Sequence, residues 1–243
     1  MKFIRRLGLQ FCIFALATLV FTTVAYGAVY GATVSRSYDG ITFTSRTSCA
    51  SFGNSIKGTV TTAASTSRPA GYLGADCWVV RNDGFVAGTA TRYSQSATSS
   101  FSTNATASGS SGRSYQTTGT SYVYLTSTGN YMSIRANPSP FLSINSLSSQ
   151  NQSAVQDGIT IDGQRYGSLQ SYLYEGDNLD LIAAVGINGM EGYIRVEDFL
   201  AIPRPSNPED AVSSFASERE VQIPVYDIDG NVIDSYCVVV GGI

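Results

Sequence analysis

The sequence predicts a mainly β protein with a small α+β part, and three observations support this fold class. Ser and Thr are abundant, and the 243 residues include 15 Tyr and 24 Gly. Short runs of β-branched and aromatic residues alternate with turn residues, as in sheets built from hairpins. A single segment has the pattern of a helix. We therefore expect an N-terminal antiparallel β-sandwich or barrel-like module, followed by a C-terminal antiparallel sheet with one helix.

The first 27 residues have the pattern of a secretory signal peptide. Three cations among the first six residues precede the apolar run LGLQFCIFALATLVFTTVA, and Ala25 and Gly27 have the spacing of a signal-peptidase site. An uncleaved membrane anchor is the alternative, because the apolar run is almost long enough to cross a bilayer. In both cases residues 28–243 are exported, since the positive head stays in the cytoplasm. We expect a protein that is secreted or held at the cell surface.

Charge divides the exported part in two. Residues 28–150 contain eight basic and three acidic residues, a net charge of +5, whereas residues 151–243 contain four basic and fifteen acidic residues, a net charge of −11. A joint change in charge and composition marks a domain boundary. The sequence therefore predicts a β-rich Ser/Thr/Tyr module over residues 28–142, a linker over residues 143–158 and an acidic α+β module over residues 159–243.

The first module is expected to hold six to eight short antiparallel strands. YLGADCWVV and FVAGTATRYSQS flank the turn RNDG, in which Asp83-Gly84 suits a tight hairpin. SYVYLTS and NYMSIRA form a second hairpin pattern beside Gly129. The intervening residues 96–119 are rich in Ser, Thr and Gly and poor in apolar residues. This composition predicts a long loop or an exposed edge.

The second module combines two hairpins with one helix. LDLIAAVG and MEGYIRVEDF have the pattern of strands around the turn Gly186–Gly189. SNPEDAVSSFASERE is the predicted helix, with Asn207 as its N-cap, Pro208 at its first position and two acidic residues after it. VQIPVYD and VIDSYCVVV form a closing hairpin around Asp229-Gly230.

The composition excludes several classes of enzyme and of cofactor-dependent protein. The chain has no histidine, which removes the Ser-His-Asp triad, the Cys-His dyad and the HExxH zinc site. It has no P-loop, and its cysteines lack the CxxC spacing of zinc and iron–sulfur sites. A net charge of −3 argues against nucleic acid as a partner. We therefore expect no cofactor, and no contact with a membrane except through the N-terminal segment if it is uncleaved.

Aromatic residues of the first module are candidates for a binding surface. An exposed row of aromatic rings would bind a glycan or a peptide by stacking. Packing inside the sheet is the alternative, since aromatic residues in strands often form cross-strand pairs. The candidate ligand-binding residues are Tyr72, Trp78, Tyr93, Tyr122 and Tyr124.

Acidic residues of the second module are candidates for catalysis. Glycoside hydrolysis needs two carboxylates about 5 to 9 Å apart on either side of a sugar. A solvated acidic face is the alternative, because these residues fall in loops and turns of a small module. The candidates are Glu175, Asp177, Asp180, Glu191, Glu197 and Asp198.

Three cysteines follow the signal segment, and two of them form a disulfide candidate. Cys49 and Cys77 are nearer each other in the chain than either is to Cys237. A bond between them would close a loop of about 28 residues, worth roughly 3 kcal/mol in the chain-entropy model. Burial as free thiols is the alternative.

The closing hairpin contains three aspartates that suggest either a turn or a calcium site. An EF-hand loop needs glycine at its sixth position, but Gly230 is fourth when Asp227 is first. Asp229-Gly230 instead favours a hairpin turn. We expect no metal, with a looser calcium site at Asp227, Asp229 and Asp234 as the alternative.

The second module also resembles a known family. DLIAAVGINGMEGYIRVEDF, then NPEDA, then IPVYDIDGNVID occur in this order within residues 160–236. This order resembles the extracytoplasmic tail of some BlaR1-like M56-family sensor peptidases, and uncharacterised exported or cell-envelope proteins of Gram-positive bacteria. The peptidase part has no counterpart, because its HExxH motif requires histidine. The resemblance implies an extracytoplasmic location and no activity.

Together these features predict a non-enzymatic exported interaction or structural protein of the cell envelope. Its partner would be a cell-wall polymer, a glycan or another surface protein. The alternatives are a small secreted glycoside hydrolase that uses carboxylates, and a secreted inhibitor or bacteriocin-like effector carried by the first module.

Overall fold

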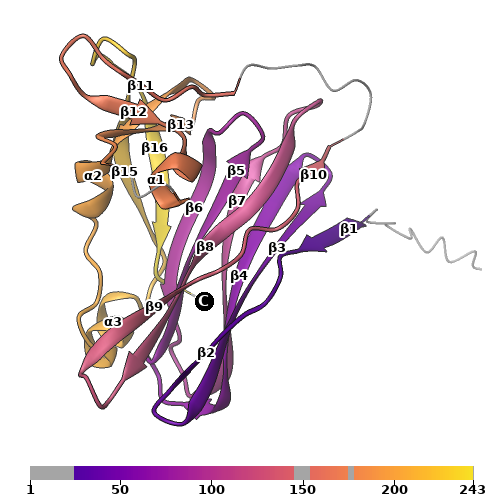
Figure 1. The fold of residues 1–243 in the computed structure, drawn as a ribbon, viewed down its shortest axis with the longest axis vertical. Coiled ribbons are helices and arrows are strands. Elements are labelled where there is room, and N and C mark those ends of the chain that lie inside the picture. Colours follow the sequence, from indigo (N-terminus) through magenta and orange to yellow (C-terminus); the bar gives the residue numbers. More distant parts are fainter. Residues whose placement is uncertain (1–24, 145–153, 175–177, 243) are drawn as a thin grey trace, which may run out of the picture.

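The computed structural model describes residues 25–144, 154–174 and 178–242, and within them the protein is mainly β with three short helices (Figure 1). The smaller sheet contains β1 (Ala25–Tyr30), β2 (Val34–Tyr38), β3 (Ile41–Phe52), β4 (Ser55–Arg68) and β7 (Thr98–Ser108). The larger sheet contains β5 (Leu73–Arg81), β6 (Val86–Tyr93), β8 (Ser114–Leu125), β9 (Asn130–Arg135), β10 (Leu142–Ser143), β11 (Gly158–Ile159), β12 (Arg165–Gly167), β13 (Leu181–Val185), β14 (Glu191–Arg195), β15 (Arg219–Tyr226) and β16 (Val232–Val240). The helices are α1 (Leu169–Tyr174), α2 (Val196–Leu200) and α3 (Pro208–Ser214). None of these helices is long and apolar enough to cross a bilayer.

The smaller sheet packs face to face on the first strands of the larger sheet. Its order is β1-β3-β4-β7, with β2 also paired to β3, and every pair is antiparallel. Ile56 and Val60 of β4 meet Cys77 and Val79 of β5 in the buried layer between the sheets. The N-terminal part is therefore the antiparallel β-sandwich that the sequence predicts. Several of its strands, such as the 14-residue β4, are longer than expected.

Hydroxyl groups fill part of the sandwich interior. Thr62 Oγ1 lies 2.6 Å from Ser121 Oγ, which donates to Ser45 Oγ at 2.7 Å, and all three residues are fully buried. Because these hydroxyls satisfy one another, strands rich in Ser and Thr can form a core. For the same reason residues 96–119 contain β7 and the start of β8. The loop alternative for this segment is wrong, and the edge alternative is confirmed, since β7 is the last strand of its sheet.

The C-terminal part of the chain continues the larger sheet. β16 pairs in parallel with β6, Val238–Val240 lying beside Thr89–Thr91, and β15, β14 and β13 follow in order. The four predicted hairpins, β5–β6, β8–β9, β13–β14 and β15–β16, are all confirmed. Residues 145–153 of the predicted linker lie outside the described residues. The parts on either side of the linker share one sheet, although they differ in charge.

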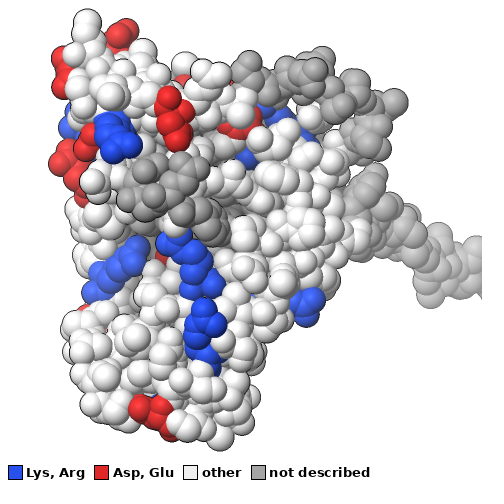
Figure 2. Space-filling model, viewed as in Figure 1, with Lys and Arg blue, Asp and Glu red and all other residues white. Residues whose placement is uncertain are grey.

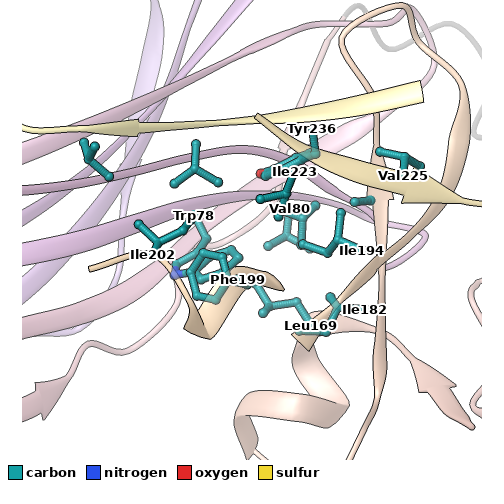
Figure 3. Close-up of a cluster of buried hydrophobic side chains, with 14 of the residues drawn as sticks. Trp78, Val80, Leu169, Ile182, Ile194, Phe199, Ile202, Ile223, Val225 and Tyr236 are labelled. Carbon is teal, nitrogen blue, oxygen red and sulfur yellow. The ribbon is translucent and has the colours of Figure 1, made fainter. Parts of the chain in front are cut away.

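A third layer covers the outer face of the larger sheet. α2 and α3 form this layer, and together with the C-terminal strands of the same sheet they bury Trp78 and Val80 of β5. The ring centroids of Trp78 and Phe199 lie 4.6 Å apart (Figure 3). The opposite side chains of β5, including Cys77 and Val79, face the smaller sheet. A strand buried on both faces is largely apolar, which explains the run YLGADCWVV, in which Asp76 is the one charged residue.

The predicted helix forms, but it is short. Asn207 Oδ1 accepts a hydrogen bond of 2.8 Å from the backbone N of Asp210, as expected for an N-cap, and the helix ends at Ser214. Residues 196–200, predicted as the end of a strand, form α2 instead, and α1 was not predicted. On the face shown in Figure 2, most acidic side chains gather over the C-terminal elements.

Candidate functional site

A groove of about 1120 Å³ lies between the edge of the smaller sheet and the C-terminal part of the larger sheet. One wall is β7, and the lining includes five consecutive residues of this strand, Asn104–Ser108. β6 contributes Ala87, Gly88 and Thr89. The other wall is the turn Val185–Gly189 between β13 and β14, together with β16. Elements that are far apart in the chain therefore form a single concave surface.

The groove opens at a gap in strand pairing along β6. β16 pairs with β6 from Thr89 onwards, and β13 pairs with it only at Val86. On this side Ala87 and Gly88 pair with neither of these two strands. A Cβ atom on Gly88 would lie 2.2 Å from the carbonyl oxygen of Thr106, so β7 can approach β6 only because residue 88 has no side chain.

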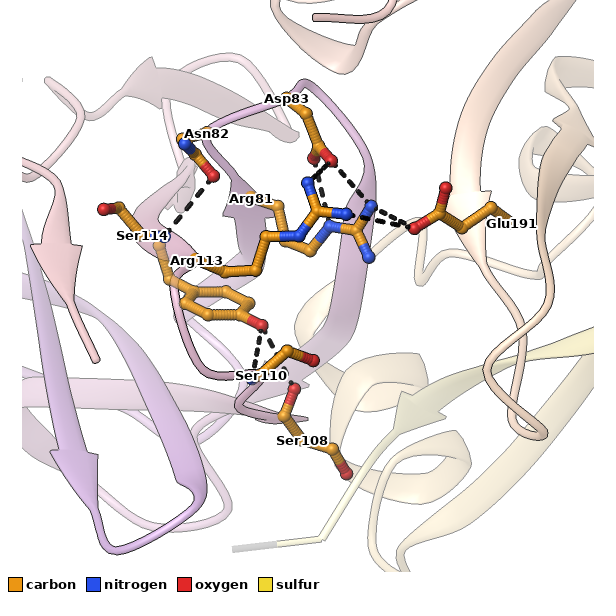
Figure 4. Close-up of polar contacts among 9 residues, drawn as sticks. Arg81, Asn82, Asp83, Ser108, Ser110, Arg113, Ser114 and Glu191 are labelled. Carbon is orange, nitrogen blue, oxygen red and sulfur yellow. Dashed lines mark hydrogen bonds and ion pairs between the residues drawn. The ribbon is translucent and has the colours of Figure 1, made fainter. Parts of the chain in front are cut away.

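Four charged residues form a cluster at one end of the groove (Figure 4). Arg81 donates to both carboxylate oxygens of Asp83, at 3.0 and 2.8 Å, and its Nη2 donates to Glu191 Oε1 at 2.6 Å. Arg113 donates to Asp83 and lies 3.5 Å from Glu191 Oε1. The β5–β6 turn supplies Arg81 and Asp83, while Arg113 precedes β8 and Glu191 begins β14. The cluster thus joins the sandwich to the C-terminal strands.

The pKa values of this cluster follow from its pairing. Burial alone would raise the pKa of Asp83, but the hydrogen bonds and charges of Arg81 and Arg113 outweigh it and hold the pKa below its usual value. Burial alone would lower the pKa of Arg81, and Asp83 and Glu191 raise it instead. Because Asp83 and Arg81 are only 4% and 6% exposed, each charge depends on its partners for stabilisation.

The rest of the lining contains donors without partners. Arg92 donates to Glu218 through its terminal nitrogen, whereas its buried Nε has no acceptor among the described residues. Lys57, on β4, forms no ion pair within the described part of the chain. Glu220 lies beside the Cys237 thiol, and burial together with this carboxylate raises the thiol's pKa. The other charged side chains of the groove lining, Arg92 included and Glu220 excepted, are in ion pairs.

The predicted aromatic surface is largely inside the protein. Trp78, Tyr93 and Tyr122 are 3%, 2% and 7% exposed, because the third layer packs over them. For these three residues the prediction of an exposed binding row is wrong. Tyr72 and Tyr124 are half-buried and meet edge to face, with ring centroids 5.2 Å apart. They lie outside the groove lining.

The disulfide candidate falls within one buried cluster. Cys49 on β3 and Cys77 on β5 are both fully buried between the sheets, and both are free thiols in the structure. Burial raises the pKa of each thiol. The disulfide between them stays a prediction.

The carboxylate candidates are dispersed. Glu175 and Asp177 lie outside the described residues. Asp180 accepts a hydrogen bond from the backbone N of Arg165. Glu197 and Asp198 belong to α2. Of the four candidates that the structure describes, Glu191 alone lines the groove, and there two arginines hold it.

The three aspartates of the closing hairpin serve two different turns. Asp227 Oδ1 accepts hydrogen bonds from the backbone N of Asp229 and of Asn231, so the loop spans residues 227–231 and is longer than the two-residue turn predicted. Asp234 accepts from Asn188 and Met190 of the neighbouring turn. Among the described residues no group of three potential ligands converges on a metal position.

A buried polar network that the sequence did not indicate lies under the third layer. Asp76, 4% exposed, accepts hydrogen bonds from Tyr122 OH at 2.7 Å and from the backbone N of Thr120 at 2.5 Å. Arg204 Nη1 in turn donates to Tyr122 OH at 2.9 Å. Burial raises the pKa of Asp76 despite these hydrogen bonds. The network fixes the segment between α2 and α3 on the sheet, and it does not line the groove.

Comparison with protein-family models, with curated proteins and with solved structures finds no match to this chain. The groove and its charge cluster are therefore interpreted from their own geometry. Many strands contribute to them, and the sequence signals at RNDG and at Gly186–Gly189 predicted turns, not a groove or an ion pair.

Proposed function

We propose that this protein is a non-enzymatic exported interaction protein of the cell envelope and that it binds its partner in the groove between β7 and the β13–β14 turn. The observation that carries the proposal is the groove itself, which combines a large concave volume with the Lys57 side chain, a cation that pairs with no other described residue. A charged side chain that is not yet paired can attract a group of opposite charge on a partner.

The arrangement favours binding over catalysis. Glu191 and Glu218 are each held by arginine, so neither is presented as a free acid or base. A glycosidase would need two carboxylates facing each other across the sugar. The signal-peptide pattern of residues 1–27 supports the proposed location outside the cytoplasm.

Retention on envelope material tests this function. The labelled full chain is incubated with intact cells of a Gram-positive bacterium and with their isolated cell walls, and the bound fraction is measured. Lys57→Glu reverses a charge in the groove, while Arg36→Glu makes the same change on an exposed position of β2 outside it. We expect retention of the wild type and of Arg36→Glu, and a loss of at least about tenfold for Lys57→Glu.

Two outcomes would contradict the proposal. One is the absence of retention on either material. The other is equal retention of both charge variants, which would place the binding surface elsewhere on the protein.

A further inference from the structure

β7 presents an unpaired backbone edge to the groove. β7 pairs only with β4, and its 11 residues, TSSFSTNATAS, contain no charged residue and no proline. Natural edge strands are usually protected by charges, proline or bulges, because a bare edge pairs with other chains. Here the protection is missing over the stretch that lines the groove.

The register identifies which backbone groups face outward. The backbone N of Gly109 donates to Asn54 O on the β4 side, at 2.6 Å. Because antiparallel pairs alternate between bonded and non-bonded, Asn104, Thr106 and Ser108 then direct their N–H and C=O groups away from β4. The position of Thr106 O beside Gly88 of β6 independently agrees with this assignment.

These outward groups are almost entirely unused. Within the described residues their sole hydrogen bond is a long one, 3.4 Å, from Tyr115 OH to Ser108 O. Side chains alternate between the two faces of a strand, so a surface lined by five consecutive residues meets the strand along its edge. The groove therefore gives access to a row of backbone donors and acceptors.

We infer that the groove binds an extended, acidic peptide segment of a partner protein, which adds to β7 as a further strand. Backbone pairing along Asn104–Ser108 would supply affinity with little dependence on sequence. Lys57 lies directly opposite Thr106 in the β4–β7 register and lines the groove, and its side chain forms no ion pair with another described residue. That charge favours a peptide with an aspartate or glutamate. The inference rests on the proposed function, because it names the kind of partner that the groove takes.

Proline substitution tests strand addition without disturbing the existing sheet. Thr106→Pro removes one outward N–H and leaves the hydrogen bonds to β4 in place. Ser102→Pro makes the same change on the same strand, at an exposed outward position that does not line the groove. Both variants are first compared with the wild type by circular dichroism and thermal unfolding.

The probe is a phage-displayed library of random dodecapeptides selected on the full wild-type chain. Selected peptides are synthesised with capped ends and a fluorophore, and their dissociation constants are measured by fluorescence polarisation. We expect acidic peptides whose affinity falls at least about tenfold with Thr106→Pro and less than about twofold with Ser102→Pro. Methylation of alternate backbone nitrogens of the peptide should weaken its binding to the wild type as much as Thr106→Pro does. This result tests strand addition even if Thr106→Pro does not fold.

Other results would overturn the inference in distinguishable ways. If Lys57→Glu abolishes peptide binding while Thr106→Pro and N-methylation have no effect, the groove binds through side chains, and the proposed function survives without strand addition. If the wild-type chain is a dimer that Thr106→Pro converts to a monomer, the edge pairs with a second copy and not with a peptide. If no peptide is selected although the chain is retained on envelope material, the partner is not a peptide.

Discussion

Arg81, at the end of β5, donates a 2.6 Å hydrogen bond to Glu191, which begins β14 and lies 110 residues further along the chain. The same arginine is bound on its other side by Asp83. A turn of the sandwich and a strand of the C-terminal part therefore share one buried cation. Removing the carboxylate of Asp83 or of Glu191 therefore weakens the contact between these two parts of the protein.

Replacing Asp83 should strongly destabilise the fold. Asp83→Asn leaves Arg81 and Arg113 buried with Glu191 as their remaining anionic partner, and breaking a buried pair in this way typically costs about 3 kcal/mol. Urea denaturation measures the free energy of unfolding. Asp162→Asn, on an exposed aspartate, serves as the control and should change it by less than about 0.5 kcal/mol. Equal effects of the two substitutions would show that the cluster does not stabilise the fold.

Acid should remove the stabilisation that Asp83 supplies. Its pKa is lowered below the ordinary value of 3.8, so the folded state binds fewer protons on this group than the unfolded state does. The contribution is therefore complete above that value and is lost as the pH falls through the lower folded pKa. Urea midpoints at pH 6, 4 and 2.5 should show the difference between wild type and Asp83→Asn narrowing only in the acid range. A constant difference would contradict this assignment.

Asp76 should show the opposite pH dependence. Burial raises its pKa above 3.8, so the folded state holds a proton that the unfolded state releases, and stability falls as the pH rises through this interval. Relative to Asp76→Asn, the wild type should lose stability between pH 4 and the folded pKa. Thermal unfolding of both proteins across this range measures the trend. A difference that does not vary with pH would mean that Asp76 keeps its ordinary pKa.

The three cysteines should differ in reactivity. Cys237 is partly exposed, whereas Cys49 and Cys77 are fully buried, so iodoacetamide should modify Cys237 alone in the folded protein. Mass spectrometry after unfolding without reductant then tests the predicted disulfide. Modification of all three would show that Cys49 and Cys77 are free, while a mass lower by two hydrogens and one modified residue would show the bond.

Export should produce a chain that begins at Ala28. Processing there would remove the pairs Ala25↔Phe52 and Tyr26↔Ser51 and would keep those of Val29 and Tyr30 with β3. N-terminal sequencing of the exported protein checks this directly. Recovery of a membrane-bound chain that retains residues 1–27 would instead support the anchor.

Local patterns predicted the strands and hairpins well. Asp83-Gly84 and Gly186–Gly189 mark real turns, and the Asn207 cap begins α3, because such features depend on residues a few positions apart. β7 was harder to predict, since Phe101 is its one large core-facing side chain, the others are threonine and alanine, and its stability comes from a neighbouring sheet.

Contacts between distant elements could not be read from local patterns. The tyrosines of β8 looked suitable for a binding surface, but whether Tyr122 faces solvent depends on α2 and α3, which pack over it from about 80 residues away. The groove depends in the same way on the position of β7 relative to β6. Single-sequence periodicity shows which side chains share a face and not what covers that face.

The central position of β16 constrains how this protein is made. β16 is the last of the described strands in chain order, yet it lies inside the larger sheet, between β6 and β15. A chain that leaves the ribosome or a translocation channel N-terminus first cannot complete this sheet until β16 has emerged. The high contact order predicts slow folding, with the β6 edge bare in the meantime. Such a late closure would fit the proposed export, because an exported chain stays unfolded while it crosses a membrane.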